Sequence, residues 1–262
     1  MSDVKMDSSY LRGMTCRRIG NVVNFHDSIP STNDLAKEMA EGGCEDGTVV
    51  IAEKQTGGKG RNGRRWESPE GGLYMSVVLK GGLDLDNIST LPLIFGLAVS
   101  KAISTTTMME SSLKWPNDVL LYGRKVCGIL MEASVKAEEV EYVVVGIGLN
   151  VNNRSEDLDP GIREGSISLS DRMGSEVDRK ELLRNLLYML DLHYDRYLGG
   201  GAALLLEEWT NRAETVGRDV RIEGPMGTVE GKALGVDQAG ALMVRENRRI
   251  TRVTSGDCLH LE

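Results

Sequence analysis

Apolar residues follow two different periods along the first 215 positions, one typical of helices and the other of buried strands. Helices are predicted from apolar spacing or from capping residues at four places, residues 31–42, 91–104, 178–198 and 203–213. Buried strands are predicted from short apolar runs between turn residues, at residues 47–54, 73–80, 125–135 and 140–152. The interleaving of the two kinds of segment predicts an α+β domain with a mixed β-sheet flanked by helices.

The pattern changes after Gly217, where five short strand-like segments follow one another in about 45 residues. Gly, Asn and Asp turns separate these segments, which is typical of a small β-barrel. We therefore predict two domains, residues 1–215 and residues 216–262. The first 20 residues are too few for a separate DNA-binding domain.

Composition and charge restrict the classes of protein to which this sequence can belong. With 40% hydrophobic and 27% charged residues the chain is expected to fold, and its net charge of -8 opposes broad binding to nucleic acid. The polar start and the absence of an apolar run approaching about 20 residues predict a cytoplasmic protein without a membrane span. Neither a zinc site nor a disulfide framework is predicted, because the cysteines are scattered and the histidines isolated (Cys16, Cys44, Cys127, Cys258, His26, His193 and His260).

One loop departs from the acidic composition: QTGGKGRNGRRWESPEGG, residues 55–72, joins two predicted strands. Five cations and no acid lie between Lys54 and Arg65, on a backbone made permissive by glycine. A solvated, mobile turn with unpaired cations is one interpretation, and a loop that closes over an anionic ligand is the other. The loop contains G-x-G-x-x-G, but Pro69 and the glycines after it exclude the helix that a dinucleotide-binding fold requires at this point.

Three further motifs have both a structural and a functional interpretation. LKWPND places Lys114 before Trp115 and Pro116, either as a lysine at a strand edge or as an ordered functional cation. GIGLN ends an apolar strand with glycines, which indicates a bulge or the close approach of a ligand or another backbone. STN begins a predicted helix at Ser31, where the residues either cap the helix or recognise a polar head group.

Taken together, STN, the basic loop, LKWPND, KVCGIL and GIGLNVN resemble the biotin–protein ligase family in order and spacing. The resemblance extends from about residue 28 to the C-terminus, where VEGKALGVDQAGAL is similar to that family's small SH3-like domain. It implies a class II synthetase-like catalytic domain, in a single-function form without the winged helix of family members that repress transcription. Such a protein would be cytoplasmic, with no nucleic-acid or membrane partner, and the resemblance leaves room for a homodimer.

The resemblance also assigns the candidate site residue by residue. Lys114 and Arg61 are the implied catalytic residues. The implied biotin-binding residues are Ser31, Thr32, Asn33, Gln55, Gly58, Lys59, Gly60, Arg61, Lys114 and Gly128. The implied ATP- and adenylate-binding residues are Arg61, Arg64, Trp66, Lys114, Asn117 and Asn150. Lys59 stands where the family usually has arginine, so this position keeps its charge but loses the planar fork that grips a phosphate.

The family's reaction is implied in two steps. Biotin's carboxylate attacks ATP, with Mg²⁺, to give biotinyl-5′-AMP, and biotin is then transferred to a lysine of a biotin carboxyl carrier protein of a carboxylase. Cations would offset the repulsion between two anionic reactants. Asp118 is the candidate orienting or proton-accepting group, and no metal ligands are identified. The alternatives are a lipoate–protein ligase, a biotin-sensing repressor and an RNA-binding module, the last opposed by 5% aromatic residues and by the net charge.

Overall fold

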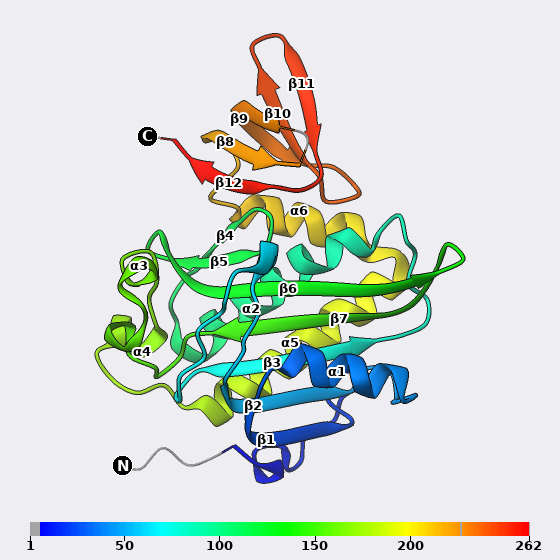
Figure 1. The fold of residues 1–262 in the computed structure, drawn as a ribbon, viewed down its shortest axis with the longest axis vertical. Helices are drawn as coiled ribbons and strands as arrows, with labels where there is room; N and C mark the ends of the chain where they lie inside the picture. The colour runs from blue at the N-terminus through cyan, green and yellow to red at the C-terminus, as the bar shows by residue number, and fades with distance from the viewer. Residues whose placement is uncertain (1–5, 226, 262) are drawn as a thin grey trace.

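The protein is organised around two β-sheets, seen in a computed structural model that describes residues 6–225 and 227–261. The larger is a seven-stranded mixed sheet with the strand order β1-β2-β3-β7-β6-β5-β4 (Figure 1). Its strands are β1 (Val23–Ile29), β2 (Val49–Gln55), β3 (Leu73–Leu79), β4 (Ser112–Lys114), β5 (Asp118–Leu121), β6 (Arg124–Lys136) and β7 (Glu139–Leu149). Strands β1 and β2 pair in parallel, and the remaining neighbours pair antiparallel.

Helices cover both faces of this sheet, which explains why its central strands are apolar on both sides. Helix α1 (Thr32–Glu41) packs on one face, against alternate residues such as Val50 and Val144. Helices α2 (Leu91–Thr107) and α5 (Arg179–Arg196) pack on the opposite face, with α6 (Ala202–Arg212) beside α2 (Figure 1). The shorter helices are α3 (Pro160–Arg163), α4 (Leu169–Met173), and the single turns Ser8–Leu11, Arg61–Gly63, Ile88–Thr90, Ser155–Asp157 and Tyr197–Gly201.

The segment Ile88–Thr107, which contains α2, corrects one expectation from the sequence. By length and composition it could cross a membrane, so the statement that no apolar stretch approaches a span was wrong. Most of its side chains are buried inside the protein, against α5, α6 and the sheet. Helix α2 therefore has an internal packing partner for nearly every apolar residue that it carries.

The second sheet, near the C-terminus, consists of the five short strands that the sequence predicted. They are β8 (Asp219–Gly224), β9 (Gly227–Val236), β10 (Leu242–Glu246), β11 (Arg249–Val253) and β12 (Asp257–His260). All pairs are antiparallel, in the order β11-β10-β9-β8-β12. This sheet lies at one end of the molecule, next to α6 and β4 (Figure 1). The division at residues 215 and 216 stays a prediction.

The long elements of the larger domain confirm the sequence analysis, and the short ones were missed. Helices α1, α2, α5 and α6 and strands β2, β3, β6 and β7 occupy the predicted segments within a few residues. Strand β1 was not predicted because its side chains are only half-buried, and β4 and β5 are three and four residues long. Helix α5 ends at Arg196, before the predicted end of its segment.

The buried face of α5 should contribute strongly to the stability of the larger domain. Leu186 of α5 is fully buried in the core, so Leu186→Ala is expected to lower the free energy of unfolding by about 2–5 kcal/mol. The neighbouring Tyr188 is 55% exposed, and Tyr188→Ala should change it by less than about 0.5 kcal/mol. Urea denaturation of both variants checks this, and equal losses would contradict the assignment of the α5 core face.

Candidate active site

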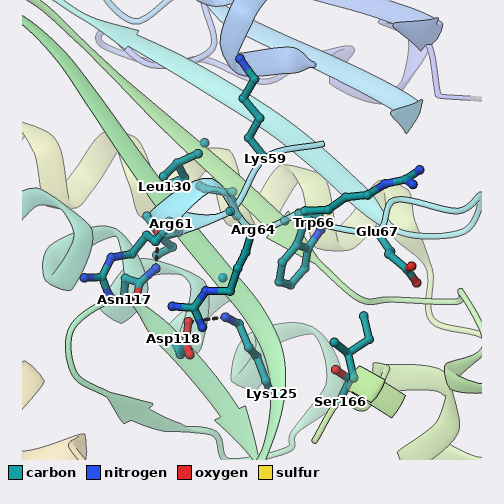
Figure 2. A pocket seen from close by; sticks show the side chains of 18 of the residues that line it. Lys59, Arg61, Arg64, Trp66, Glu67, Asn117, Asp118, Lys125, Leu130 and Ser166 are labelled. Carbon is teal, nitrogen blue, oxygen red and sulfur yellow. Dashed lines mark hydrogen bonds and ion pairs between the residues drawn. The ribbon is translucent and has the colours of Figure 1, made fainter. Parts of the chain in front are cut away.

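A cavity of about 340 Å³ opens where the basic loop, β4–β7 and strand β12 meet (Figure 2). Its size is that of a small-molecule site. Thirteen of the predicted site residues line it: Ser31, Thr32, Asn33, Gln55, Lys59, Gly60, Arg61, Arg64, Trp66, Lys114, Asn117, Gly128 and Asn150. The exception is Gly58, where a Cβ would lie 2.4 Å from the carbonyl oxygen of Trp66. Gly58 therefore permits the loop to fold closely, and it does not face the cavity.

The start of α1 builds a polar wall of the cavity. Ser31 caps the helix by accepting from the backbone N–H of Asp34 at 3.4 Å, so the predicted cap is confirmed. Thr32 donates its backbone N–H to Gln55 Oε1 at 2.8 Å. Ser76 of β3 places its Oγ 2.6 Å from Asn33 Oδ1. These buried groups are held by one another, which fixes their donors and acceptors before any ligand arrives.

The glycines of GIGLN leave space for the side chains of Asn33 and Trp66, and not for another backbone. A Cβ on Gly146 would lie 2.1 Å from Asn33 Oδ1, and a Cβ on Gly148 would lie 2.4 Å from the indole Nε1 of Trp66. Gly128, opposite Gly148 in the β6–β7 pairing, also lies against the Trp66 ring. The indole thus rests on a bare patch of sheet. Its Nε1–H is buried and has no hydrogen-bond partner among the described residues.

The basic loop is a folded hairpin. Trp66 donates its N–H to the carbonyl of Gly58 at 2.9 Å, and Gly60 donates to the carbonyl of Arg64 at 2.7 Å. At its tip Asn62 has a φ of 56°, a left-handed conformation that asparagine tolerates. The loop joins the antiparallel strands β2 and β3, so the described chain has no helix at the position that a dinucleotide-binding fold requires.

Four of the five cations, those within residues 55–72, have partners, so for these four the expectation that they are unpaired was wrong. Lys59 Nζ lies 2.7 Å from Asp34 Oδ1 in the first turn of α1. Arg64 lies 2.5 Å from Asp257 Oδ1 of β12. Arg61 is divided between the two sheets, because it donates to Asn117 Oδ1 and to the carbonyl of Gly256, each at 3.2 Å. The remaining arginine, Arg65, donates to the Thr56 carbonyl at 3.4 Å.

These contacts explain the electrostatics of the site. Burial opposes ionisation of Asp34 and of Asp257, but Lys59 and Lys37 at the former and Arg64 and Arg61 at the latter outweigh it, so the pKa of each carboxyl lies below its ordinary value. Both carboxylates are therefore charged at neutral pH. Burial lowers the pKa of Arg61, which nevertheless stays protonated because guanidinium starts so far above neutrality.

Two lysines of the cavity wall lie on β4 and β6, the strands on either side of β5. Lys114 of β4 pairs in register with Asp118 of β5. Lys125 of β6 places its Nζ 2.6 Å from Asp118 Oδ1 and 5.4 Å from the centre of the Trp66 ring (Figure 2). Sequence reasoning missed Lys125, although it begins the quoted motif KVCGIL. Its ammonium is held between a carboxylate and an aromatic face, and it lines the same cavity as Lys114.

Other parts of the wall had no signal in the sequence. Strand β12 contributes Asp257, Cys258 and Leu259, and the segment after β7 contributes Leu158 and Ile162. Asn150 lies at the end of β7, where its side chain donates to the carbonyl of Ile167 at 3.4 Å. Among residues 6–225 and 227–261, no group of three or more His, Cys, Asp or Glu side chains could hold a metal ion.

Comparison with known proteins places this chain in a family. The sequence model of the Biotin/lipoate A/B protein ligase family matches residues 25–150, and that of the Biotin protein ligase C terminal domain matches residues 215–261. The "Bifunctional ligase/repressor BirA" of Bacillus subtilis is 34% identical over 255 residues, which are 97% of this chain and 78% of that protein. The chain belongs to the biotin protein ligase family.

Two further members support the assignment of the family across both sheets. The "Biotin--[acetyl-CoA-carboxylase] ligase" of Mycobacterium tuberculosis is 34% identical over 241 residues, 88% of this chain and 86% of that protein. The structure of the biotin protein ligase from Aquifex aeolicus in complex with biotin and ATP superposes with a TM-score of 0.81 at 30% identity. It covers 92% of this chain and 99% of its own. This agreement confirms the predicted fold, a mixed sheet flanked by helices and followed by a small SH3-like domain.

The bare patch under Trp66 can be tested with one methyl group. Gly148→Ala would place its Cβ 2.4 Å from the indole, so the ring must move and the hairpin should detach from the sheet. Trypsin cleavage between Lys59 and Arg65 is expected to rise about tenfold or more, because exposed flexible loops are the preferred sites of nicking. In α2, Gly96→Ala meets only ordinary contacts of 3.6 and 3.7 Å and serves as the control. Unchanged cleavage in Gly148→Ala would show that Trp66 does not anchor the loop.

Proposed function

We propose that this protein activates biotin with ATP to biotinyl-5′-AMP and pyrophosphate, and then transfers biotin to a lysine of a biotin carboxyl carrier protein. One observation carries the proposal: a fixed polar wall and a cluster of cations line a single cavity. Such a cavity suits a ligand with a polar head and an anionic tail, next to a nucleotide. Family membership and the Aquifex aeolicus complex with biotin and ATP support the same conclusion.

The polar wall would hold the ureido head of biotin. Thr32, Asn33 and Gln55 offer donors and acceptors that are already oriented, which suits a neutral group that both donates and accepts. The apolar side chains of Ile147 and Leu130 and the face of Trp66 would cover the carbon skeleton. With its head at this wall, the carboxylate of biotin would point toward the lysines of β4 and β6.

The first step brings two anions together. A carboxylate oxygen forms a bond to the α-phosphorus of ATP while the bond from that phosphorus to pyrophosphate breaks. Lys114, Lys125 and Arg61 would lower the repulsion and stabilise the charge that gathers on the phosphoryl oxygens. Asn117 holds Arg61 in place, and Arg64 would face the outer phosphates. Preorganised cations contribute most in a cavity from which the closed hairpin excludes water.

Mg²⁺ enters this scheme with the nucleotide, as MgATP. Asp118 and Asp257, the carboxylates nearest the cations, each form an ion pair, and Glu67 accepts a hydrogen bond from the backbone N–H of Asp159 at 2.8 Å. The described residues therefore do not form a carboxylate site for the ion on their own. Magnesium commonly binds through substrate phosphates and water with few protein ligands, which fits this arrangement.

The second step needs an amine that has lost its proton. A free lysine has a pKa of about 10.4, so the acceptor must be deprotonated as it attacks the acyl carbon and releases AMP. Asp118 is our candidate proton acceptor, and its ion pair with Lys125 also gives it an orienting role. We place the reaction in the cytoplasm, where the four cysteines, all free, would remain thiols. A homodimeric state and the lack of a nucleic-acid partner stay predictions.

Mass spectrometry separates the proposed function from its rival. Protein incubated with MgATP and biotin should yield biotinyl-5′-AMP and an equal amount of pyrophosphate. Lipoate in place of biotin should yield neither above background. Adenylate formation from lipoate, with none from biotin, would assign the protein to lipoate ligation instead.

Lys114 is expected to act on the chemical step. Lys114→Met keeps the apolar stem, so the midpoint of thermal unfolding should change little while kcat for adenylate formation falls by about 10²–10³. Lys125→Met should behave likewise, because its ammonium lines the same wall. Lys136→Met, at the exposed end of β6, is the matched control and should retain wild-type kcat. If Lys114→Met kept wild-type kcat, Lys114 would be a lysine at a strand edge without a role in the reaction.

A further inference from the structure

The chain between α6 and β8 runs alongside the strand that carries Lys114. This connector (residues 213–215) forms a parallel bridge from Ala213 to Leu113 of β4. Glu214 donates its backbone N–H to the Leu113 carbonyl at 2.8 Å and accepts from the Ser112 hydroxyl at 2.6 Å. It therefore acts as an extra strand at the outer edge of the larger sheet, which otherwise ends at β4.

The next residue of the connector, Thr215, is completely buried and takes part in two hydrogen bonds. Its Oγ1 accepts from the backbone N–H of Trp115 at 3.1 Å and lies 3.0 Å from Nε2 of His260 in β12. Because an N–H can only donate, Oγ1 accepts from Trp115, and toward Nε2 it donates or accepts according to the tautomer of His260. The three groups form a chain from Trp115 through Thr215 to a neutral imidazole.

The charges around His260 favour this neutral form. Lys114, Arg218 and Glu214 are the charged groups that act on the ring. Burial and then the two cations lower the pKa of His260 to about 4, although Glu214 opposes them. The imidazole is therefore neutral around pH 7, with one ring nitrogen that donates and one that accepts.

The connector engages the residues on both sides of Lys114, namely Leu113 and Trp115. The indole of Trp115 adds a third anchor, because its Nε1 donates to the carbonyl of Gly240 at 3.1 Å, in the turn between β9 and β10. Thr215 and His260 do not line the cavity. Thr215 can nevertheless act on the chemistry through its hydrogen bond to the peptide N–H of Trp115, next to Lys114.

We propose that Thr215, with His260 behind it, is a positioning residue that makes the C-terminal sheet set the place of the Lys114 ammonium. This inference rests on the proposed function for its kinetic consequence, but its geometric consequence is independent. A reacting group displaced by about 1 Å can lose on the order of 10²-fold in rate, so losing one of the bonds that bracket Lys114 should be visible in kcat.

Replacement of the hydroxyl is the direct test. Thr215→Val keeps the shape of the side chain but leaves the Trp115 N–H without its acceptor, and kcat for adenylate formation should fall about 10- to 100-fold. KM for biotin should stay within about twofold, because the hydrogen bonds of the polar wall do not involve Thr215 or Trp115. Thr215→Ser restores the hydroxyl and should recover at least a third of wild-type kcat. A loss of thermal stability in Thr215→Val without a change in kcat, or a failure of Thr215→Ser to recover it, would overturn the proposal.

A double variant shows whether Thr215 acts through Lys114. If it does, Lys114→Met combined with Thr215→Val should react no more slowly than Lys114→Met alone, because the group being positioned is already gone. A further 10-fold loss in the double variant would mean that Thr215 acts on something else. The second hydrogen bond is tested at His260, where Gln keeps an acceptor and Leu does not. His260→Leu should lower kcat toward that of Thr215→Val, and His260→Gln should not.

A readout without substrate separates this inference from the proposed function. Trace labelling of the protein with acetic anhydride, followed by mass spectrometry, reports the relative reactivity of each lysine. Thr215→Val should change the labelling of Lys114 relative to Lys136 at least threefold, and Thr215→Ser should restore it. This result is expected whichever acid the wild-type protein activates. An unchanged Lys114 reactivity would refute the positioning role even if biotin proved to be the substrate.

Discussion

The structure depends on keeping several cations beside one cavity in a protein whose net charge is -8. Three carboxylates make this possible, and each comes from a different part of the chain: Asp34 from α1, Asp118 from β5 and Asp257 from β12. Each pairs with a different cation of the site. Partly exposed pairs of this kind contribute about 0–1 kcal/mol each, so the phosphate and carboxylate oxygens of substrates can replace them at little cost. The carboxylates therefore hold the cations in place without competing strongly for them.

A second constraint concerns the surface on which these groups rest. The central strands carry large apolar residues almost throughout, yet the cavity needs room for Asn33 and Trp66 directly on the sheet. Gly146 and Gly148 provide that room, two residues apart and so on the same face of β7. Their loss of β-propensity is offset by the side chains that lie over them, which replace the packing a Cβ would have supplied. The polar wall and the hairpin thus depend on the absence of side chains at Gly146 and Gly148.

The sequence predicts the parts of the structure in which local pattern and tertiary packing agree. Helix α5 and strand β7 bury a continuous stripe or face, so their periods are visible in a short window. The site motifs were identified by resemblance, and most of their residues line one cavity. Lys125 was missed, although its motif had been noticed, because the local sequence pattern does not indicate that Lys125 pairs with Asp118 across the β5–β6 hairpin.

Single polar residues with distant partners lie beyond any local pattern. Thr215 and Trp115 are 100 positions apart, and Arg64 and Asp257 are 193 apart. A threonine in a connector and an aspartate at the start of a strand are ordinary residues until the two sheets are placed together. Gly256 is a further residue whose role depends on distant partners. A Cβ there would lie 2.9 Å from the Glu223 carbonyl, and the carbonyl of Gly256 accepts a hydrogen bond from Arg61.

Strand β4 shows what the smaller sheet contributes to the larger one. It has three residues, it lies at the edge of the larger sheet, and it carries Lys114. A strand that short has few ladder hydrogen bonds, and an edge strand has them on one side only, so its own sheet holds it loosely. The reacting role that we propose for its ammonium requires the opposite. The connector, Gly240 and the chain through Thr215 to His260 supply the missing bonds from the other side. The C-terminal sheet and its connector thus complete the hydrogen bonding at the edge of the larger sheet, next to Lys114 and the cavity.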